Sequence, residues 1–397
     1  MSSLLVSLSS KPFLRKLALR CHTLRHLSSS TTTNPYMMYC VTYCGDNVSY
    51  DGKEYPVAGA MTKLRMYDPA KEDYFTVGDK PLPKEMVRSS LVGSSHGWGV
   101  FFGPHNSTLI SDYWNPSSSK SNPKMIHLPP RPDHLNKTGL VSSVAMSSSP
   151  EEDDCVTAVK FKGRQVNIYK PGLEDMVILT PKLFEYFDKG KLMYSKRDQR
   201  FYILSSGGRH LCSFSAAEST TPQYHDLRFH NFPQFSVSES LDFVIGAKKE
   251  YFVESPSGQR FLVKWYVEDP ATKYVEDPVL KRLKPKFRGT GRFMVFREEE
   301  DMNMCYTEDI GDLCIFLGNN EPFCVKASSS PGLNPNFIYF AGEGYNECFG
   351  DYDIATRTPR NFIPKSISAF SDLTTNGQGQ VYMVCDWVPH WVPPVSL

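Results

Sequence analysis

The chain of 397 residues lacks the long hydrophobic runs from which membrane-spanning helices are built. A helix needs about 20 consecutive apolar residues to cross a bilayer, and here every apolar run is interrupted by charged residues, Gly, Pro or Ser. Helical periodicity over the roughly 11 residues that define an amphipathic helix is also scarce. We therefore expect no insertion into a membrane and a fold that is not built from helices.

Acidic side chains are missing from the N-terminal segment, since no Asp or Glu precedes Asp46. Residues 1–35 contain five basic residues and twelve Ser or Thr. On a helix, four of their apolar side chains would share one face: Leu14, Leu17, Cys21 and Leu24. This composition is typical of an organellar transit peptide. We predict that residues 1–35 direct import into the mitochondrion and are then removed, with the plastid, or import into both organelles, as the alternative.

The rest of the chain has no excess of basic charge. Five of the 44 Lys and Arg residues lie in the leader, so residues 36–397 carry 39 of them against 43 Asp and Glu. Duplex-binding proteins gain most of their affinity by neutralising phosphates, so we expect no nucleic-acid partner. The one dense basic stretch, residues 281–288, is interpreted as a solvated connector, and a local site for an anionic partner is the alternative.

Short runs rich in aromatic and β-branched residues, separated by turn residues, dominate residues 36–397. For example, the runs 250–254 and 259–265 flank the turn sequence Ser255–Gly258, a pattern typical of a β-hairpin. The chain is therefore predicted to be all-β and mostly antiparallel.

An aromatic residue followed by a turn recurs along the chain, at Tyr67, Trp114, Tyr169, Phe214, Phe296 and Tyr352. Four of the five steps between them span 45 to 56 residues, close to the roughly 40–50 residues of a four-stranded propeller blade. The step of 82 residues from Phe214 to Phe296 indicates an insertion or an additional blade. We predict a β-propeller of about six four-stranded blades over residues 36–397, with a pair of β-sandwiches as the alternative.

The C-terminal segment Val381–Cys385 has the composition of a strand. Pairing of this strand with the first blade would close the ring and remove unpaired edges. We expect Trp387 and Trp391, which neighbouring prolines flank, to cap this closure.

Two late blocks, Cys305–Val325 and Pro331–Phe340, resemble the C-terminal signature of the plant DUF295 family. The segments Ser95–Gly99 and Tyr113–Pro116 resemble its first-blade pattern, so the resemblance covers roughly residues 60–365. It implies a kelch-like propeller of unassigned biochemistry, and it supplies no catalytic residues. Many members carry an N-terminal F-box. Because a basic leader occupies that place here, the chain is similar to an organellar branch of the family.

No group of residues predicts a catalytic, cofactor-binding or metal site. His96 is interpreted as a residue at the start of a strand, because no Ser or Cys nucleophile motif accompanies it. Two sets of residues lack zinc-site spacing, Cys40 with Cys44 and the irregular set His210, Cys212, His225 and His230. The carboxylates Glu308, Asp309 and Asp312 lack the calcium-loop pattern and are interpreted as turn residues. The nine cysteines beyond the leader are expected to be buried thiols.

The sequence therefore favours a non-enzymatic binding or scaffold propeller, a monomer whose loops on one face recognise a protein partner. An enzyme with its site in the central channel is one alternative. A substrate adaptor of F-box type that has lost its box is another. His and carboxylate groups converging at the channel would favour the enzyme, and exposed aromatic side chains on one rim would favour the binding protein.

Overall fold

The computed structural model describes residues 34–50, 53–130, 141–162, 165–170, 177–179, 184–215, 221–236, 247–267, 274–276, 283–285, 290–342, 349–362, 383–384 and 389–394. The predicted transit peptide, except for Asn34 and Pro35, lies outside these residues, as do Trp387 and most of the basic stretch 281–288. Asn34–Leu397 forms one structural unit.

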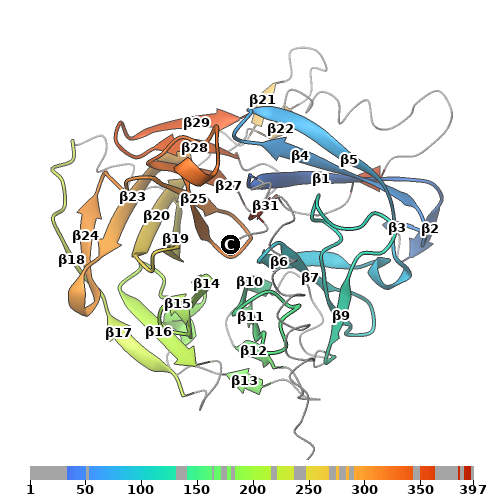
Figure 1. The fold of residues 1–397 in the computed structure, drawn as a ribbon, viewed down its shortest axis with the longest axis horizontal. Coiled ribbons are helices and arrows are strands. Elements are labelled where there is room, and N and C mark those ends of the chain that lie inside the picture. The colour runs from blue at the N-terminus through green and yellow to red at the C-terminus, as the bar shows by residue number, and fades with distance from the viewer. Residues whose placement is uncertain are drawn as a thin grey trace, which may run out of the picture. The chain divides into compact units, whose positions relative to one another are not determined.

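Six β-sheets stand around a central hub as the blades of a propeller (Figure 1). Blade 1 contains β1 (Tyr36–Cys44), β4 (Met61–Asp68) and β5 (Asp73–Pro81), with β30 (Met383–Val384) and β31 (His390–Val392) along the inner side of β1. Blade 2 contains β6 (Ser90–Ser95), β7 (Trp98–Phe102), β8 (Thr108–Ser111) and β9 (Met125–Leu128). Blade 3 contains β10 (Val141–Met146), β11 (Thr157–Phe161), β12 (Val166–Tyr169) and β13 (Val177–Leu179). In each blade the strands run from the hub outward in this order.

The second half of the ring is more elaborate. Blade 4 contains β14 (Leu192–Ser195), β15 (Arg200–Leu204), β16 (His210–Ser215) and β17 (Gln223–Asp226). Blade 5 contains β19 (Ala247–Glu254), β20 (Arg260–Val267), β23 (Thr290–Glu298) and β24 (Asn303–Thr307), with β18 (Arg228–His230) added to its outer edge. Blade 6 contains, from the hub outward, β26 (Phe323–Lys326), β25 (Leu313–Leu317), β27 (Phe337–Ala341), β28 (Phe349–Asp353) and β29 (Thr358–Phe362).

The remaining elements are small. Two separate hairpins pair β2 (Asn47–Tyr50) with β3 (Lys53–Pro56) and β21 (Tyr274–Glu276) with β22 (Leu283–Pro285). Short 3-10 turns occur at η2 (Lys84–Met86), η5 (Phe184–Phe187), η6 (Glu300–Met302) and η7 (Ala327–Ser329). None of the helices among the described residues has the length and hydropathy that a bilayer-spanning segment requires.

The core consists of six apolar clusters, one between each pair of neighbouring blades. Side chains alternate between the two faces of a strand, and β15 shows the result. Phe201 and Ile203 join the cluster shared with blade 3, whereas Tyr202 and Leu204 join the cluster shared with blade 5. Because both faces are buried, these strands are nearly continuous apolar runs rather than alternating ones.

The predicted repeat corresponds to the blades. In each blade, one strand directly precedes the outer strand in the chain, and five of the repeat's aromatic residues lie on this strand (β4, β12, β16, β23 and β28). Trp114 lies just beyond the equivalent strand of blade 2, β8. The prediction of a six-bladed all-β propeller is therefore confirmed, and the pair of β-sandwiches is excluded. The step of 82 residues is an insertion and not an additional blade, because it contains β18 and the β21–β22 hairpin in addition to the strands of one blade.

Ring closure by the C-terminal segment is also confirmed. Within the predicted strand, Met383 and Val384 pair with Tyr43 and Thr42 of β1. A second strand, β31, pairs with Tyr36–Met38. Trp391 on β31 is fully buried, and its indole N–H donates to the Leu317 carbonyl at 3.1 Å.

Candidate functional site

The β25–β26 hairpin of blade 6 extends toward the hub, where β31 and the inner strands of the other blades also lie (Figure 1). Its turn, residues 318–322, contacts β6 of blade 2, because the Glu321 N–H donates to the Ser94 carbonyl at 2.7 Å. The same turn holds the closing strand. The side-chain oxygen of Asn320 accepts a hydrogen bond from the Trp391 N–H at 3.1 Å.

The Glu321 carboxylate lies where three further blades meet. It accepts hydrogen bonds from the Ser95 hydroxyl of blade 2 at 2.5 Å, the Met146 N–H of blade 3 at 3.2 Å and the Tyr194 N–H of blade 4 at 2.6 Å. Burial raises the pKa of Glu321 to about 7, although these three donors favour the ionised form and lower it in part. One side chain of blade 6 thus braces blades 2, 3 and 4.

His96 belongs to the same group. It lies in the two-residue turn between β6 and β7, with a left-handed φ of 49°, and its Nδ1 is 2.8 Å from the Ser95 hydroxyl. Burial, followed by the charge of Lys196, lowers the pKa of His96 to about 4, so the imidazole is neutral at pH 7. The structure therefore joins a Ser, a His and a Glu that the sequence did not connect.

The hydrogen-bond order of this group differs from that of a catalytic triad. In a triad the imidazole lies between the hydroxyl and the carboxylate, whereas here the Ser95 hydroxyl lies between His96 and Glu321. A hydroxyl has one proton, and Ser95 donates it to Glu321 when that carboxylate is ionised. Nδ1 of His96 must therefore donate to Ser95, so in this arrangement it does not accept the proton that would activate the serine.

Among the described residues, three cavities are lined by the turns that connect strands within the blades. The central one, of about 510 Å³, is lined by Ser95, His96, Lys196, Glu321, Phe323 and Trp391 among others. A second, of about 990 Å³, adjoins it at His96 and extends to the β10–β11 loop. The third, of about 830 Å³, lies between the β14–β15, β19–β20 and β23–β24 turns. These turns join either the first and second or the third and fourth strands of a blade, counted from the hub, and in an antiparallel sheet both kinds of turn lie at the same end. All three cavities therefore open on the same face, the cavity face.

A family model described as the KIB1-4 beta-propeller matches residues 66–371, which is most of the chain. The chain belongs to the KIB1-4 beta-propeller family. No curated protein matches it significantly. The propeller architecture implied by the resemblance in the sequence is thus accompanied by a family match that covers blades 2 to 6 and the outer part of blade 1.

Solved structures similar to this KIB1-4 propeller are distant. The Cps50 (Swd1) beta-propeller domain of Myceliophteria thermophila has 9% identity and a TM-score of 0.28, over 65% of this chain and 84% of that one. A 6-phosphogluconolactonase homologue from Bacteroides uniformis has 8% identity and a TM-score of 0.33, over 89% and 99%. The periplasmic gluconolactonase of Pseudomonas aeruginosa has 13% identity and a TM-score of 0.29, over 68% and 84%.

The polar residues weighed in the sequence mostly make local contacts in this propeller. Glu308 pairs with Arg357, while Asp309 and Asp312 accept from the Gly311 and Ser328 N–H groups. Asp309 is a turn residue as expected, because its partner lies two residues away, whereas Glu308 and Asp312 link segments that are 49 and 16 residues apart. His210 pairs with Asp226 at 2.7 Å, and Cys212 is buried in the apolar cluster between blades 3 and 4.

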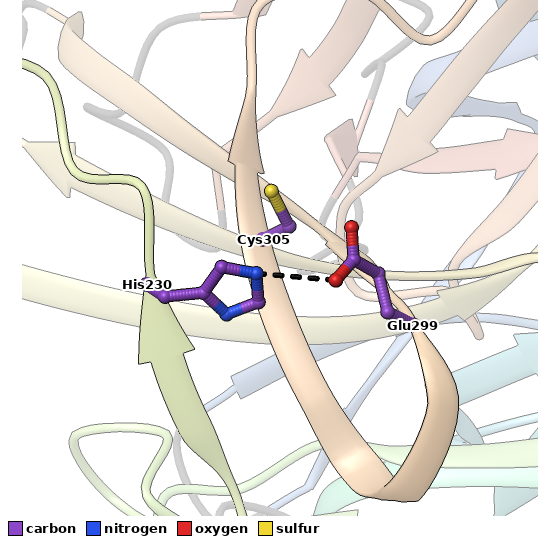
Figure 2. A group of neighbouring side chains, drawn as sticks. All are labelled: His230, Glu299 and Cys305. Carbon is purple, nitrogen blue, oxygen red and sulfur yellow. Dashed lines mark hydrogen bonds and ion pairs between the residues drawn. The ribbon is translucent and has the colours of Figure 1, made fainter.

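One group was missed by the sequence analysis. His230 of β18 lies beside Cys305 of β24 and Glu299 of the preceding turn (Figure 2), and among the described residues their ligand atoms lie within 4.8 Å of one another. His230 and Cys305 are far apart in the sequence and share no motif. The pairing of β18 with β24 brings His230 and Cys305 together, and no local pattern in the sequence predicts this pairing.

Proposed function

We propose that the chain is a non-catalytic binding propeller that recognises a protein partner through the cavity face. The observation that carries this proposal is the opening of all three cavities on one face, around a hub braced by Glu321. Rigid blades hold such loops in place for recognition. The donation of the Ser95 hydroxyl proton to the ionised Glu321 carboxylate supports a binding role over a nucleophilic one.

The chemistry of the cavity face indicates what the partner presents. Six residues give the central cavity apolar walls: Met193, Pro256, Pro322, Phe323, Trp391 and Pro393. The adjoining cavity is bordered by the exposed acidic loop Glu151–Asp154. We infer that a partner inserts an apolar side chain into the central cavity and places basic side chains beside the acidic loop.

The test compares partners recovered from isolated organelles by proximity labelling with the full chain. Replacement of the four acidic residues 151–154 by Ser should remove the specific partners. Replacement of Asp46 and Asp226, which are exposed acidic residues that line none of the three cavities, serves as the control and should not remove them. Equal loss with both variants, or with neither, would contradict recognition by the cavity face.

The enzymatic alternative is favoured by a single observation, the meeting of Ser95, His96 and Glu321 beside the central cavity. It predicts that the purified chain hydrolyses activated esters and that Ser95→Ala abolishes this turnover. The proposed binding function predicts no turnover by either protein. A hydrolysis rate that depends on Ser95 would replace the binding proposal.

We also propose that residues 1–35 direct mitochondrial import and that the chain represents an organellar branch of the DUF295 family. The basic, Ser-rich and acid-free composition of this segment supports the proposal. A fluorescent protein fused to residues 1–35 should enter mitochondria, and the chain without these residues should not. Retention of both proteins in the cytosol would favour the adaptor of F-box type.

A further inference from the structure

We propose that His230, Glu299 and Cys305 form a zinc(II) site on the outer edge of blade 5, away from the hub. Figure 2 shows the three side chains gathered together, with a dashed line between His230 and Glu299. The Nε2 atom of His230 lies 3.1 Å from a carboxylate oxygen of Glu299. The three ligand atoms all lie within 4.8 Å of one another.

The sheet places two of the ligands. The strand β18 leaves blade 4 and pairs in parallel with β24, so that His230 is the register partner of Cys305. Partners in register share one face of a sheet. Phe229 and Met304, one position earlier on each strand, pack in the apolar cluster between blades 4 and 5, so His230 and Cys305 lie on the opposite, accessible face.

The third ligand comes from the β23–β24 turn. The Glu299 N–H donates to the Asn303 carbonyl at 2.8 Å and closes the turn over η6. This turn places Glu299 next to the strand that carries Cys305. Three ligands from three segments thus meet without any sequence motif, and their positions follow from backbone pairing rather than from flexible loops alone.

The donor set selects the ion. Zinc is bound tetrahedrally by imidazole nitrogen, thiolate sulfur and carboxylate oxygen, whereas calcium and magnesium need oxygen ligands in larger numbers. Bonds of about 2.0–2.3 Å place tetrahedral ligands roughly 3.3–3.8 Å apart. The His230–Glu299 separation is close to this range, and all three ligand atoms lie within 4.8 Å of one another. A side-chain rotation that moves the Cys305 sulfur by about 1 Å therefore completes the set. A water molecule would take the fourth position.

The exposure of the site fits reversible binding. The side chains of His230 and Glu299 are 46% and 51% exposed, so an ion can reach them without opening the fold. Glu299 also lines the third cavity of the cavity face. Zinc binding is measured on the purified chain without a partner, however, so each proposal can fail alone.

The experiment titrates the purified full chain with cobalt(II) as a spectroscopic substitute for zinc. Wild-type protein should develop a thiolate-to-cobalt charge-transfer band and the visible bands of tetrahedral cobalt, and zinc should remove both. Cys305→Ser should abolish the charge-transfer band. His230→Gln should weaken cobalt binding by more than about tenfold, since loss of an outer-shell partner alone typically costs 10- to 100-fold.

Matched controls use a half-buried thiol and an exposed His–carboxylate pair elsewhere. Cys44→Ser and His210→Gln should bind cobalt as wild type does. A Cys305→Ser variant with an unchanged spectrum, or wild-type protein without a charge-transfer band, would overturn the proposal. If the variants do not fold, alkylation of the wild-type thiols tests the proposal instead. Zinc should slow the alkylation of Cys305 but not that of Cys44. Equal alkylation of Cys305 with and without zinc would overturn the proposal.

Discussion

The hub and the outer edge of blade 5 both gather polar side chains from distant segments, but only the hub uses them to hold the fold together. At the hub, the Glu321 carboxylate is enclosed and accepts three hydrogen bonds from three blades. At the edge, His230 and Glu299 are about half exposed and make one contact with each other. Buried polar groups are costly unless they are hydrogen-bonded, whereas exposed groups can exchange water for a ligand. The contrast separates a structural brace from a candidate binding site.

The largest effect should come from removal of the closing segment, residues 381–397. Deletion exposes the edge of β1 and eliminates the burial of Trp391, for which Trp→Ala alone costs about 3–5 kcal/mol. We expect Tm to fall by about 10 °C or more, measured by calorimetry. Trp391→Phe, which keeps a ring but loses the bond to Leu317, should cost much less. An unchanged Tm after deletion would show that the segment does not close the ring.

Loss of the brace should come next. Glu321→Ala leaves three buried donors of blades 2, 3 and 4 without an acceptor. Each unsatisfied group costs about 1–3 kcal/mol, so the free energy of unfolding in urea should fall by at least about 3 kcal/mol. Glu321→Gln keeps one acceptor oxygen and should lose less. Equal stability of Glu321→Ala and wild type would show that the blades do not depend on this contact.

The hub should also make stability depend on pH. The folded pKa of Glu321, about 7, lies above its ordinary value of 4.5. Between these values the folded state keeps a proton that the unfolded state releases, so stability falls as the pH rises, by up to roughly 3 kcal/mol. The folded pKa of His96, about 4 against 6.5, acts in the opposite direction, so stability rises between pH 4 and 6.5.

Two variants separate these opposing contributions in urea unfolding at several pH values. Relative to Glu321→Gln, wild type should lose stability from pH 4.5 to 7. Relative to His96→Gln, it should gain stability from pH 4 to 6.5. Parallel pH profiles for wild type and both variants would indicate that neither group titrates differently in the folded state.

The smallest effect should come from the edge. In protein without metal, Cys305→Ser should change the free energy of unfolding by no more than about 0.5 kcal/mol, because surface substitutions rarely do more. Thermal unfolding with a chelator measures this change. A loss of several kcal/mol would mean that Cys305 supports the fold, and the contrast between hub and edge would disappear.

Much of the fold could be predicted because its signals are local. The run Arg200–Leu204 predicts a strand, and the turn Ser255–Gly258 predicts a hairpin. The recurring aromatic residues mark the strand that precedes the outer strand of each blade. The segment His390–Val392 was not predicted as a strand, because three residues between prolines have no distinctive period. The strand β18 was missed for the same reason, and with it His230 as a neighbour of Cys305.

The amino-acid sequence by itself determined the blades, their approximate number, the strand character of the closing segment and the basic composition of residues 1–35, because each depends on residues that are near one another in the chain. Only the tertiary structure decided which side chains meet. Ser95 and Glu321 are 226 positions apart, and His230 reaches Glu299 across 69. Such contacts arise from ring closure and from strand register between segments, for which no local pattern of residues exists.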